Sequence, residues 1–172
     1  MTGSGHLKTG IAFSTAVILN IWLLTNNSFF AISAAVTCIL GAKAPDYLEL
    51  RKKGGGTIIP HRTITHWVLM WVLVFLSFDI SIRSFSFWGG FNYSILIQYL
   101  CCLGYGYAFG GIVHLLGDFP NKQGIPFLLP KSTKFALYLW NSGKHESAII
   151  SVSILVSALY ILLKLGILSI NY

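Results

Sequence analysis

Five long apolar segments constrain this chain more than any other feature. They cover approximately residues 9–25, 28–42, 64–82, 94–116 and 147–170, and only short polar connections and an N-terminal tail remain. A helix needs roughly 20 apolar residues to cross a bilayer, and several segments approach or exceed that length. The mean hydropathy of +0.70 agrees. The sequence therefore predicts an all-α, polytopic membrane bundle of about five hydrophobic helices, with residues 1–172 in a single domain.

The first two segments decide the topology. Asn26 and Asn27 interrupt them and predict a turn, so each segment can cross once, or the pair can form a re-entrant hairpin. If both merged into one tilted helix, His6 would move to the other side of the membrane. Cleavage of the first segment as a signal peptide is a further alternative, but no small-residue cleavage site follows Leu24. We therefore expect an even number of crossings before Asp46.

Under this topology positive charge is distributed unevenly. Of the 12 Lys and Arg residues, only Arg83 and Lys164 fall on or near the side of the membrane opposite the N-terminus. The others are Lys8, Lys43, Arg51, Lys52, Lys53, Arg62, Lys122, Lys131, Lys134 and Lys144. Because cytoplasmic loops carry an excess of Lys and Arg, the side with these ten residues is predicted to be cytoplasmic, and the N-terminus lies on it. The basic loops suit the anionic headgroups of a lipid bilayer, and no nucleic-acid partner is expected.

Side chains with metal-binding chemistry gather on the same side. All five histidines and all acidic residues except Asp79 fall there. His114 and Asp118 are four residues apart, so a continuing helix presents both on one face. His61 and His66 bracket the start of the third segment. Each of these residues alone has a simpler explanation, such as a headgroup contact, but ionisable groups at a membrane are costly, and their joint occurrence predicts a functional site.

Four motifs resemble those of a known family. They are Gly5-His6-Leu7, the stretch 41–46 that ends in Pro45-Asp46, HRTITH at 61–66, and the run from Gly110 through His114 and Asp118 to Pro130. In order and spacing they resemble the YdjM-like, LexA-regulated, membrane-bound metal-dependent hydrolases. The resemblance implies a multi-pass protein of the bacterial inner membrane with a metal site. The implied ligands are His6, Asp46, His61, His66, His114 and Asp118.

Two positions depart from the family pattern. The family commonly has a second acidic residue close after the aspartate, whereas Glu49 follows Asp46 by three positions, which leaves a second carboxylate ligand open. Trp67 stands where a small polar residue is common.

The chemistry of these residue types points to zinc. Mixed imidazole and carboxylate ligands suit that ion, and six of them indicate either two ions or supporting roles for some. Zinc can activate water for hydrolysis while a nearby carboxylate takes the proton, and Glu146 is the candidate base. Arg62 is the candidate for binding an anionic phosphate, with a headgroup contact as the alternative. His145 is expected to be a surface residue.

The leading hypothesis is a zinc-dependent hydrolase at the cytoplasmic interface of the membrane. The basic surroundings and the apolar stretch 124–130 favour a lipid-like substrate or a phosphoester, including a phosphorylated small molecule. A metal or proton transporter is one alternative, although the ionisable residues cluster at one end and form no relay across the bilayer. A non-catalytic accessory protein with a structural metal is another.

Overall fold

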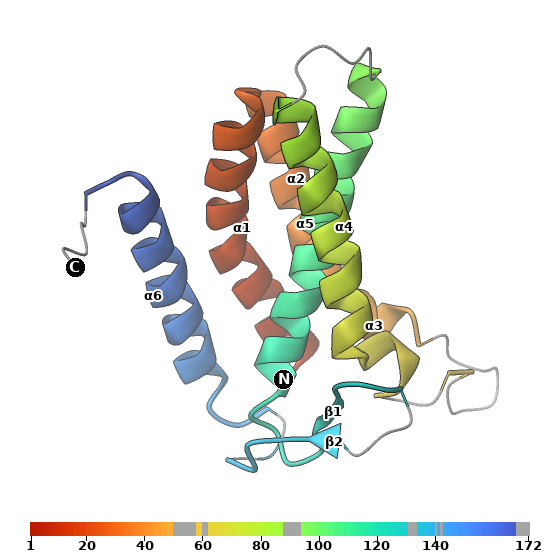
Figure 1. Cartoon of the computed structure of the whole chain (residues 1–172). Coiled ribbons are helices and arrows are strands. Elements are labelled where there is room, and N and C mark those ends of the chain that lie inside the picture. The colour runs from red at the N-terminus through yellow and green to blue at the C-terminus, as the bar shows by residue number, and fades with distance from the viewer. Residues whose placement is uncertain are drawn as a thin grey trace.

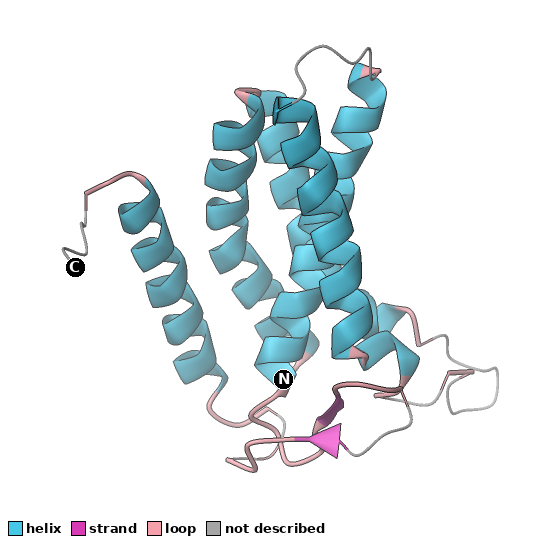
Figure 2. Ribbon diagram, viewed as in Figure 1, coloured by secondary structure: helices cyan, strands magenta, loops and turns pink. Residues whose placement is uncertain are grey.

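The computed structural model describes residues 1–49, 58–59, 62–87, 94–130, 134–139, 141 and 143–167, except for the side chains of 85–87. The helices of this part of the chain are α1 (Gly3–Thr25), α2 (Ser28–Gly41), α3 (Ala44–Tyr47), α4 (Val68–Phe87), α5 (Ile95–Asp118) and α6 (Glu146–Lys164). A 3₁₀ turn, η1 (Ile64–His66), precedes α4. Two short antiparallel strands, β1 (Ile125–Pro126) and β2 (Lys134–Phe135), follow α5 (Figure 2).

The predicted helical membrane bundle is confirmed. Three helices, α1, α5 and α6, are long and apolar enough to cross a bilayer. The 14 residues of α2 make it a shorter apolar helix, and the 20-residue α4 completes the set of hydrophobic segments. The predicted count of about five is approximate, because the short α3 adds a further helix.

The helices are arranged around α5, which packs against α1, α2 and α4, whereas α6 stands outside this group and packs against α1 (Figure 1). The N-terminus, α3, the strands and the start of α6 all lie at the lower end of Figure 1. The turn between α1 and α2 lies at the upper end. The two helices thus form an antiparallel pair, as an even number of crossings before Asp46 requires.

Close contact between α2 and α5 depends on glycine. A Cβ atom at Gly106 would collide with the carbonyl oxygen of Ala34, and one at Gly110 would collide with that of Cys38. Small residues four positions apart allow the backbones of membrane helices to approach in this way. The contact holds the last turns of α5 against the end of α2 and so fixes the helix that carries His114.

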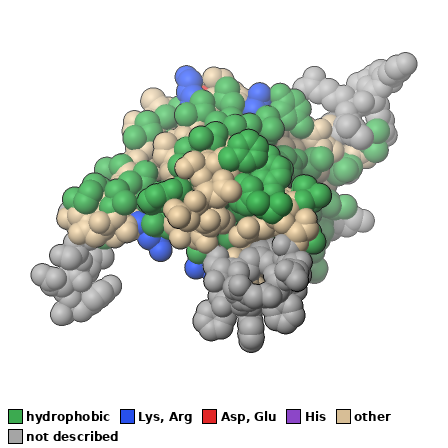
Figure 3. Space-filling view, turned by 90° about the horizontal axis from the view of Figure 1, so that it is seen from above, with side chains coloured by type: hydrophobic (Ala, Val, Ile, Leu, Met, Phe, Trp, Pro, Cys, Tyr) green, Lys and Arg blue, Asp and Glu red, His purple; other side chains and the backbone are tan. Residues whose placement is uncertain are grey.

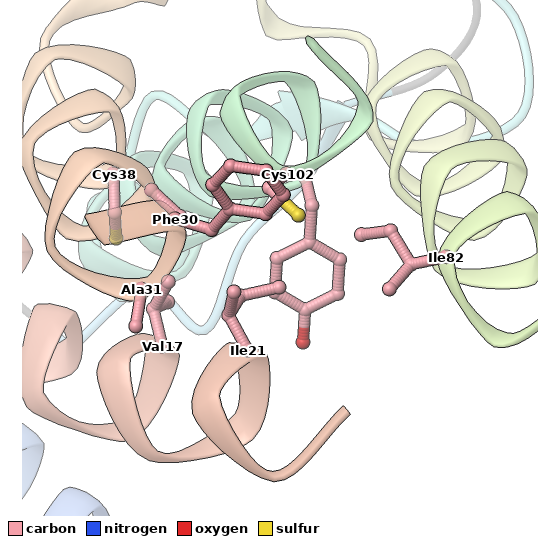
Figure 4. Close-up of a cluster of buried hydrophobic side chains, with 9 residues drawn as sticks. Val17, Ile21, Phe30, Ala31, Cys38, Ile82 and Cys102 are labelled. Carbon is pink, nitrogen blue, oxygen red and sulfur yellow. The ribbon is translucent and has the colours of Figure 1, made fainter. Parts of the chain in front are cut away.

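A hydrophobic core fills the upper half of the bundle. Val17 and Ile21 of α1, Phe30 of α2, Ile82 of α4 and Cys102 of α5 belong to it, and all five are buried (Figure 4). The upper end of the molecule presents mainly hydrophobic and uncharged polar side chains, with a few Lys and Arg residues at its edges (Figure 3). Buried ionisable side chains are found instead at the lower end.

Candidate metal centre

Five of the six predicted ligands meet at the lower end of the bundle. His6 lies in the first turns of α1, Asp46 lies on α3, His66 ends η1, and His114 and Asp118 lie in the last turns of α5. The three histidines and Asp118 are almost completely buried, with exposed fractions of 2% or less. The sixth, His61, lies outside the described residues.

His66 reaches the site from a turn rather than from a helix. The sequence predicted a helical segment from residue 64, but α4 begins at Val68, and Trp67 between η1 and α4 has an extended backbone. The indole of Trp71 donates a hydrogen bond to the carbonyl oxygen of Thr65, with 2.8 Å between the heavy atoms. This bond fixes the turn against α4 and leaves the ring of His66 directed into the bundle.

Three ligand atoms form a compact triangle. The Nε2 atoms of His66 and His114 are 3.2 Å apart, and Oδ1 of Asp46 lies 3.5 Å from the first and 3.6 Å from the second. Oδ2 of Asp118 lies 3.8 and 3.9 Å from the same two nitrogens. Tetrahedral zinc with bonds of about 2.0–2.1 Å separates its ligand atoms by about 3.3–3.4 Å. The two imidazoles together with either carboxylate could therefore hold one ion after small adjustments.

The tautomers of the two imidazoles also fit a cation. His114 Nδ1 lies 2.9 Å from the carbonyl oxygen of Ala42, to which it must donate. His66 Nδ1 lies 3.1 Å from Oε1 of Glu49, a carboxylate that it can only face as a donor. In a neutral imidazole the other nitrogen then carries a lone pair. Two lone pairs thus face each other at 3.2 Å, an arrangement that repels unless a proton or a metal ion lies between them.

His6 is a buried imidazole without hydrogen bonds. Within the described part of the chain neither of its ring nitrogens makes one, although Nε2 lies 3.4 Å from Oδ1 of Asp118. Its ring stacks on that of His114, with 3.7 Å between the centroids. An unpaired polar group in an apolar interior costs free energy. Two overlapping groups have ligand atoms close enough together that each could hold a metal ion: His6 with Asp46 and His114, and His66 with His114 and Asp118.

Asp118 is held by an extensive set of donors. The Arg62 guanidinium donates to Oδ2 at 2.7 Å, and the Asn121 amide donates to Oδ1 at 3.0 Å. The amino group of Met1 lies 2.5 Å from the same Oδ1. Arg62 also donates to the carbonyl oxygen of Gly124 at 3.2 Å, and its backbone has a φ of 56°, a left-handed conformation that is uncommon outside glycine. Arg62 is thus buried and bound to Asp118.

Asp46 is the most accessible member of the cluster. About 41% of its side chain is exposed, in contrast to its neighbours. Burial raises the pKa of Asp46, but the hydrogen bond with His66 and the charges of His114 and His6 outweigh this effect and lower it to about 2. Asp46 is therefore ionised at neutral pH and lies where solvent reaches the site.

Glu49 is the main participant that sequence reasoning left open. Its Oε1 accepts hydrogen bonds from the backbone N–H of Arg62 and from the hydroxyl of Thr65, each at 3.0 Å, in addition to its contact with His66. Such carboxylates orient the histidines that bind metals. Its position one helical turn after Asp46 was the available signal. Asn121, three residues after Asp118, was not predicted either.

The predicted base lies at the edge of the site. The carboxylate of Glu146 accepts hydrogen bonds from the backbone N–H of Thr2 and from its hydroxyl, the latter at 2.9 Å. It therefore packs against the start of α1, beside Gly5. His145 is exposed, as predicted for a surface residue.

The chain was compared with known proteins. A family model described as YdjM inner membrane protein matches residues 1–170. No curated protein and no solved structure matches. The match covers every residue of the cluster.

Proposed function

The chain belongs to the YdjM inner membrane protein family and is a multi-pass inner-membrane protein, and on that premise we propose that it is a metal-dependent hydrolase. The proposed ion is zinc, in one or two copies, bound at the cytoplasmic interface. The observation that carries the proposal is the buried set of three imidazoles, in which the Nε2 atoms of His66 and His114 face each other at 3.2 Å and the third ring makes no hydrogen bond among the described residues.

The ligand set supports zinc among the common divalent ions. Imidazole nitrogen together with carboxylate oxygen is a combination typical of zinc, whereas calcium and magnesium favour oxygen ligands alone. A zinc ion at this position would supply a Lewis acid that polarises a carbonyl or phosphoryl oxygen. The charge balance is compatible, because the carboxylates of Asp46, Glu49 and Asp118 outnumber the cationic groups of Arg62 and Met1 around them.

Asp46 and Glu146 are alternative proton acceptors. A general base must lie within hydrogen-bonding reach of the proton that it takes. Asp46 is ionised, partly exposed and next to two ligand nitrogens, whereas the carboxylate of Glu146 is engaged by Thr2. When His66, His114 and Asp118 hold the ion, these contacts favour Asp46, which is then not a ligand, as the group that orients and deprotonates the attacking water. Substituting each of the two carboxylates by its amide and measuring kcat distinguishes Asp46 from the alternative, Glu146.

Arg62 acts in this proposal through Asp118. The guanidinium is buried and its two terminal nitrogens are engaged by Asp118 and Gly124, which supports a positioning role over direct binding of a phosphate. By holding the carboxylate in one orientation, Arg62 would reduce the freedom that this ligand loses when the ion binds.

The surroundings of the centre support a substrate taken from the membrane interface. The stretch after β1 exposes large apolar side chains beside the site, namely Phe127, Leu128 and Leu129, which are 49%, 60% and 63% exposed. The same connection carries lysines that suit anionic headgroups. A lipid-like molecule or a phosphoester is therefore the favoured substrate class.

The test is hydrolysis of phosphomonoester and carboxyl-ester lipids by the detergent-purified protein loaded with zinc. We expect activity that a chelator abolishes and that His114→Ala removes. His145→Ala is the matched control, because it makes the same substitution at an exposed position and should keep the activity. Equal activity in both variants would reject the proposed site.

A further inference from the structure

A cavity lies beside the centre, between α6 and the bundle. Its volume is about 350 Å³, within the range of ligand-binding pockets. Residues of α1, α5 and α6 line it, among them Thr9, Val113, Gly117 and Val152. The helix α6 contacts α1 on both sides of the cavity: Glu146 accepts a hydrogen bond from the hydroxyl of Thr2 at one end, and the hydroxyls of Ser157 and Thr15 are 3.0 Å apart at the other.

The cavity adjoins the predicted ligands through glycine. A Cβ atom at Gly117 would lie 3.1 Å from Sδ of Met1 and 3.4 Å from the ring of His6, so this glycine of the lining packs beside both. Val113 and Gly117 each directly precede a ligand of α5, and Thr9 lies one turn after His6 on α1. A molecule in the cavity would thus lie against the helical turns that carry three of the predicted ligands.

The lining offers little to a polar ligand. Its two buried hydroxyls donate to their own helices: Thr9 to the carbonyl oxygen of His6 at 2.9 Å, and Ser153 to that of Ile149 at 2.8 Å. The flanks are formed by Leu116 and Val152, which are 58% and 59% exposed and face the bilayer if the helices cross it. Hydrocarbon is the ligand chemistry that such a surface fits.

The space continues toward the other end of the bundle. A second cavity of about 450 Å³ shares Phe13 and Val156 with the first and reaches the level of Tyr105 and Asp79. The two cavities adjoin at these two residues on the inner side of α6, and the second ends at the charged side chains of Asp79, Arg83 and Lys164. An extended chain could therefore lie along the apolar part of both.

We propose that the space between α6 and the bundle binds the hydrocarbon tail of a membrane lipid whose anionic head lies at the metal centre, beside the lysines of the connection after α5. This inference rests on the proposed function and narrows its substrate class to a lipid, for which a phosphate head is the probe chosen below. The open side toward the bilayer would let the tail enter laterally, while the head stays at the interface.

The test uses phosphatidic acid with a diazirine in its acyl chain, a phospholipid whose head is a phosphomonoester. Proteoliposomes containing the whole protein are irradiated, and the labelled peptides are identified by mass spectrometry. We expect labels to concentrate on the segments 113–117 and 148–156. Labelling spread evenly over the exposed face of α6, including Leu159 and Leu163 beyond the expected segment, would overturn the proposal.

A pair of matched variants sharpens the test. Ala148→Phe places a ring into the cavity next to the centre, whereas Ala158→Phe makes the same change on α6 outside the lining residues. Overfilling a site is unfavourable. We therefore expect labelling at 113–117 to be roughly tenfold lower in Ala148→Phe than in the wild type, and unchanged in Ala158→Phe. Equal labelling in the two variants would contradict the proposal. Should Ala148→Phe not fold, Val152→Phe blocks the same cavity one turn later.

Hydrolysis is measured in parallel, so that the two proposals can fail separately. Focused labelling without hydrolysis by the wild type would support the tail site and reject the enzyme. Hydrolysis with evenly spread labels would support the enzyme and reject the tail site. In His114→Ala the labelling of the tail site should persist while the activity is lost, because His114 does not line the cavity.

Discussion

Replacing Glu49 by glutamine should weaken zinc binding although it removes no ligand. Oε1 of Glu49 receives the N–H of Arg62, the hydroxyl of Thr65 and the Nδ1–H of His66 within 3.0–3.1 Å. The carboxylate thereby fixes the tautomer and the ring orientation of His66 and raises the basicity of Nε2. Glutamine has almost the same shape, but it lacks the negative charge.

The expected loss can be estimated from these contacts. A hydrogen bond to a charged group contributes about 1.5–3 kcal/mol and a neutral one about 0.5–1.5 kcal/mol. Neutralising the partner of His66 should therefore cost about 1–2 kcal/mol of binding free energy. Removal of such supporting groups typically reduces metal affinity by about 10–100-fold, which agrees with this estimate.

The assay is competition for zinc between the detergent-purified protein and a chromophoric chelator. Glu146→Gln is the matched control, because its carboxylate binds Thr2 instead of a ligand, and its zinc affinity should equal that of the wild type. Unchanged affinity in Glu49→Gln, or equal losses in the two variants, would refute the assigned role of Glu49.

Three further predictions concern other parts of the centre. Asp46→Asn should keep its zinc but reduce kcat by about 100-fold or more, the range of general-base catalysis, and Glu146→Gln should leave kcat nearly unchanged. The reverse result would assign the base to Glu146, and loss of zinc from Asp46→Asn would make Asp46 a ligand instead. Arg62→Lys should lower zinc affinity by about tenfold, since a lysine lacks the planar fork that engages Asp118 and Gly124 together. The control is Arg83→Lys, in an exposed ion pair with Asp79, which should leave the zinc affinity unchanged. Equal affinities in the two variants would contradict the positioning role of Arg62. Gly110→Leu should destabilise the protein by at least about 1–3 kcal/mol, seen as a lower thermal unfolding temperature in detergent, because the side chain would collide with the carbonyl oxygen of Cys38. The control Gly3→Ala, with open space around the glycine, should leave the unfolding temperature unchanged. An unchanged unfolding temperature in Gly110→Leu would show that the α2–α5 contact is not as close as described.

Much of the bundle could be predicted because hydrophobicity and helical periodicity are local properties. The length of the apolar segments indicated membrane helices, and the four-residue spacing of His114 and Asp118 placed both on one face of α5. The four-residue spacing of Gly106 and Gly110 is typical of close contacts between membrane helices, and the structure shows such a contact with α2. Topological parity was sufficient to bring His6, Asp46 and His66 to the same end.

The parts that escaped prediction depend on tertiary contacts. Nothing local to HRTITH shows that His66 ends a 3₁₀ turn, since the bond from Trp71 to Thr65 joins the turn to the following helix. The role of Glu49 could not be predicted because its partners, Arg62, Thr65 and His66, follow it by 13 or more residues and meet it only in the folded protein. The ion pair of Arg62 with Asp118 could not be foreseen either, because the two residues are far apart along the chain.

The metal content of the purified protein tests the central claim most directly. Elemental analysis of the wild type, His114→Ala, Asp118→Ala and the control His145→Ala, all purified in detergent, should give one or two zinc equivalents per chain in the wild type and the control. Both ligand variants should lose zinc while they remain folded. A folded wild-type protein that retains no divalent metal after incubation with zinc would contradict the account.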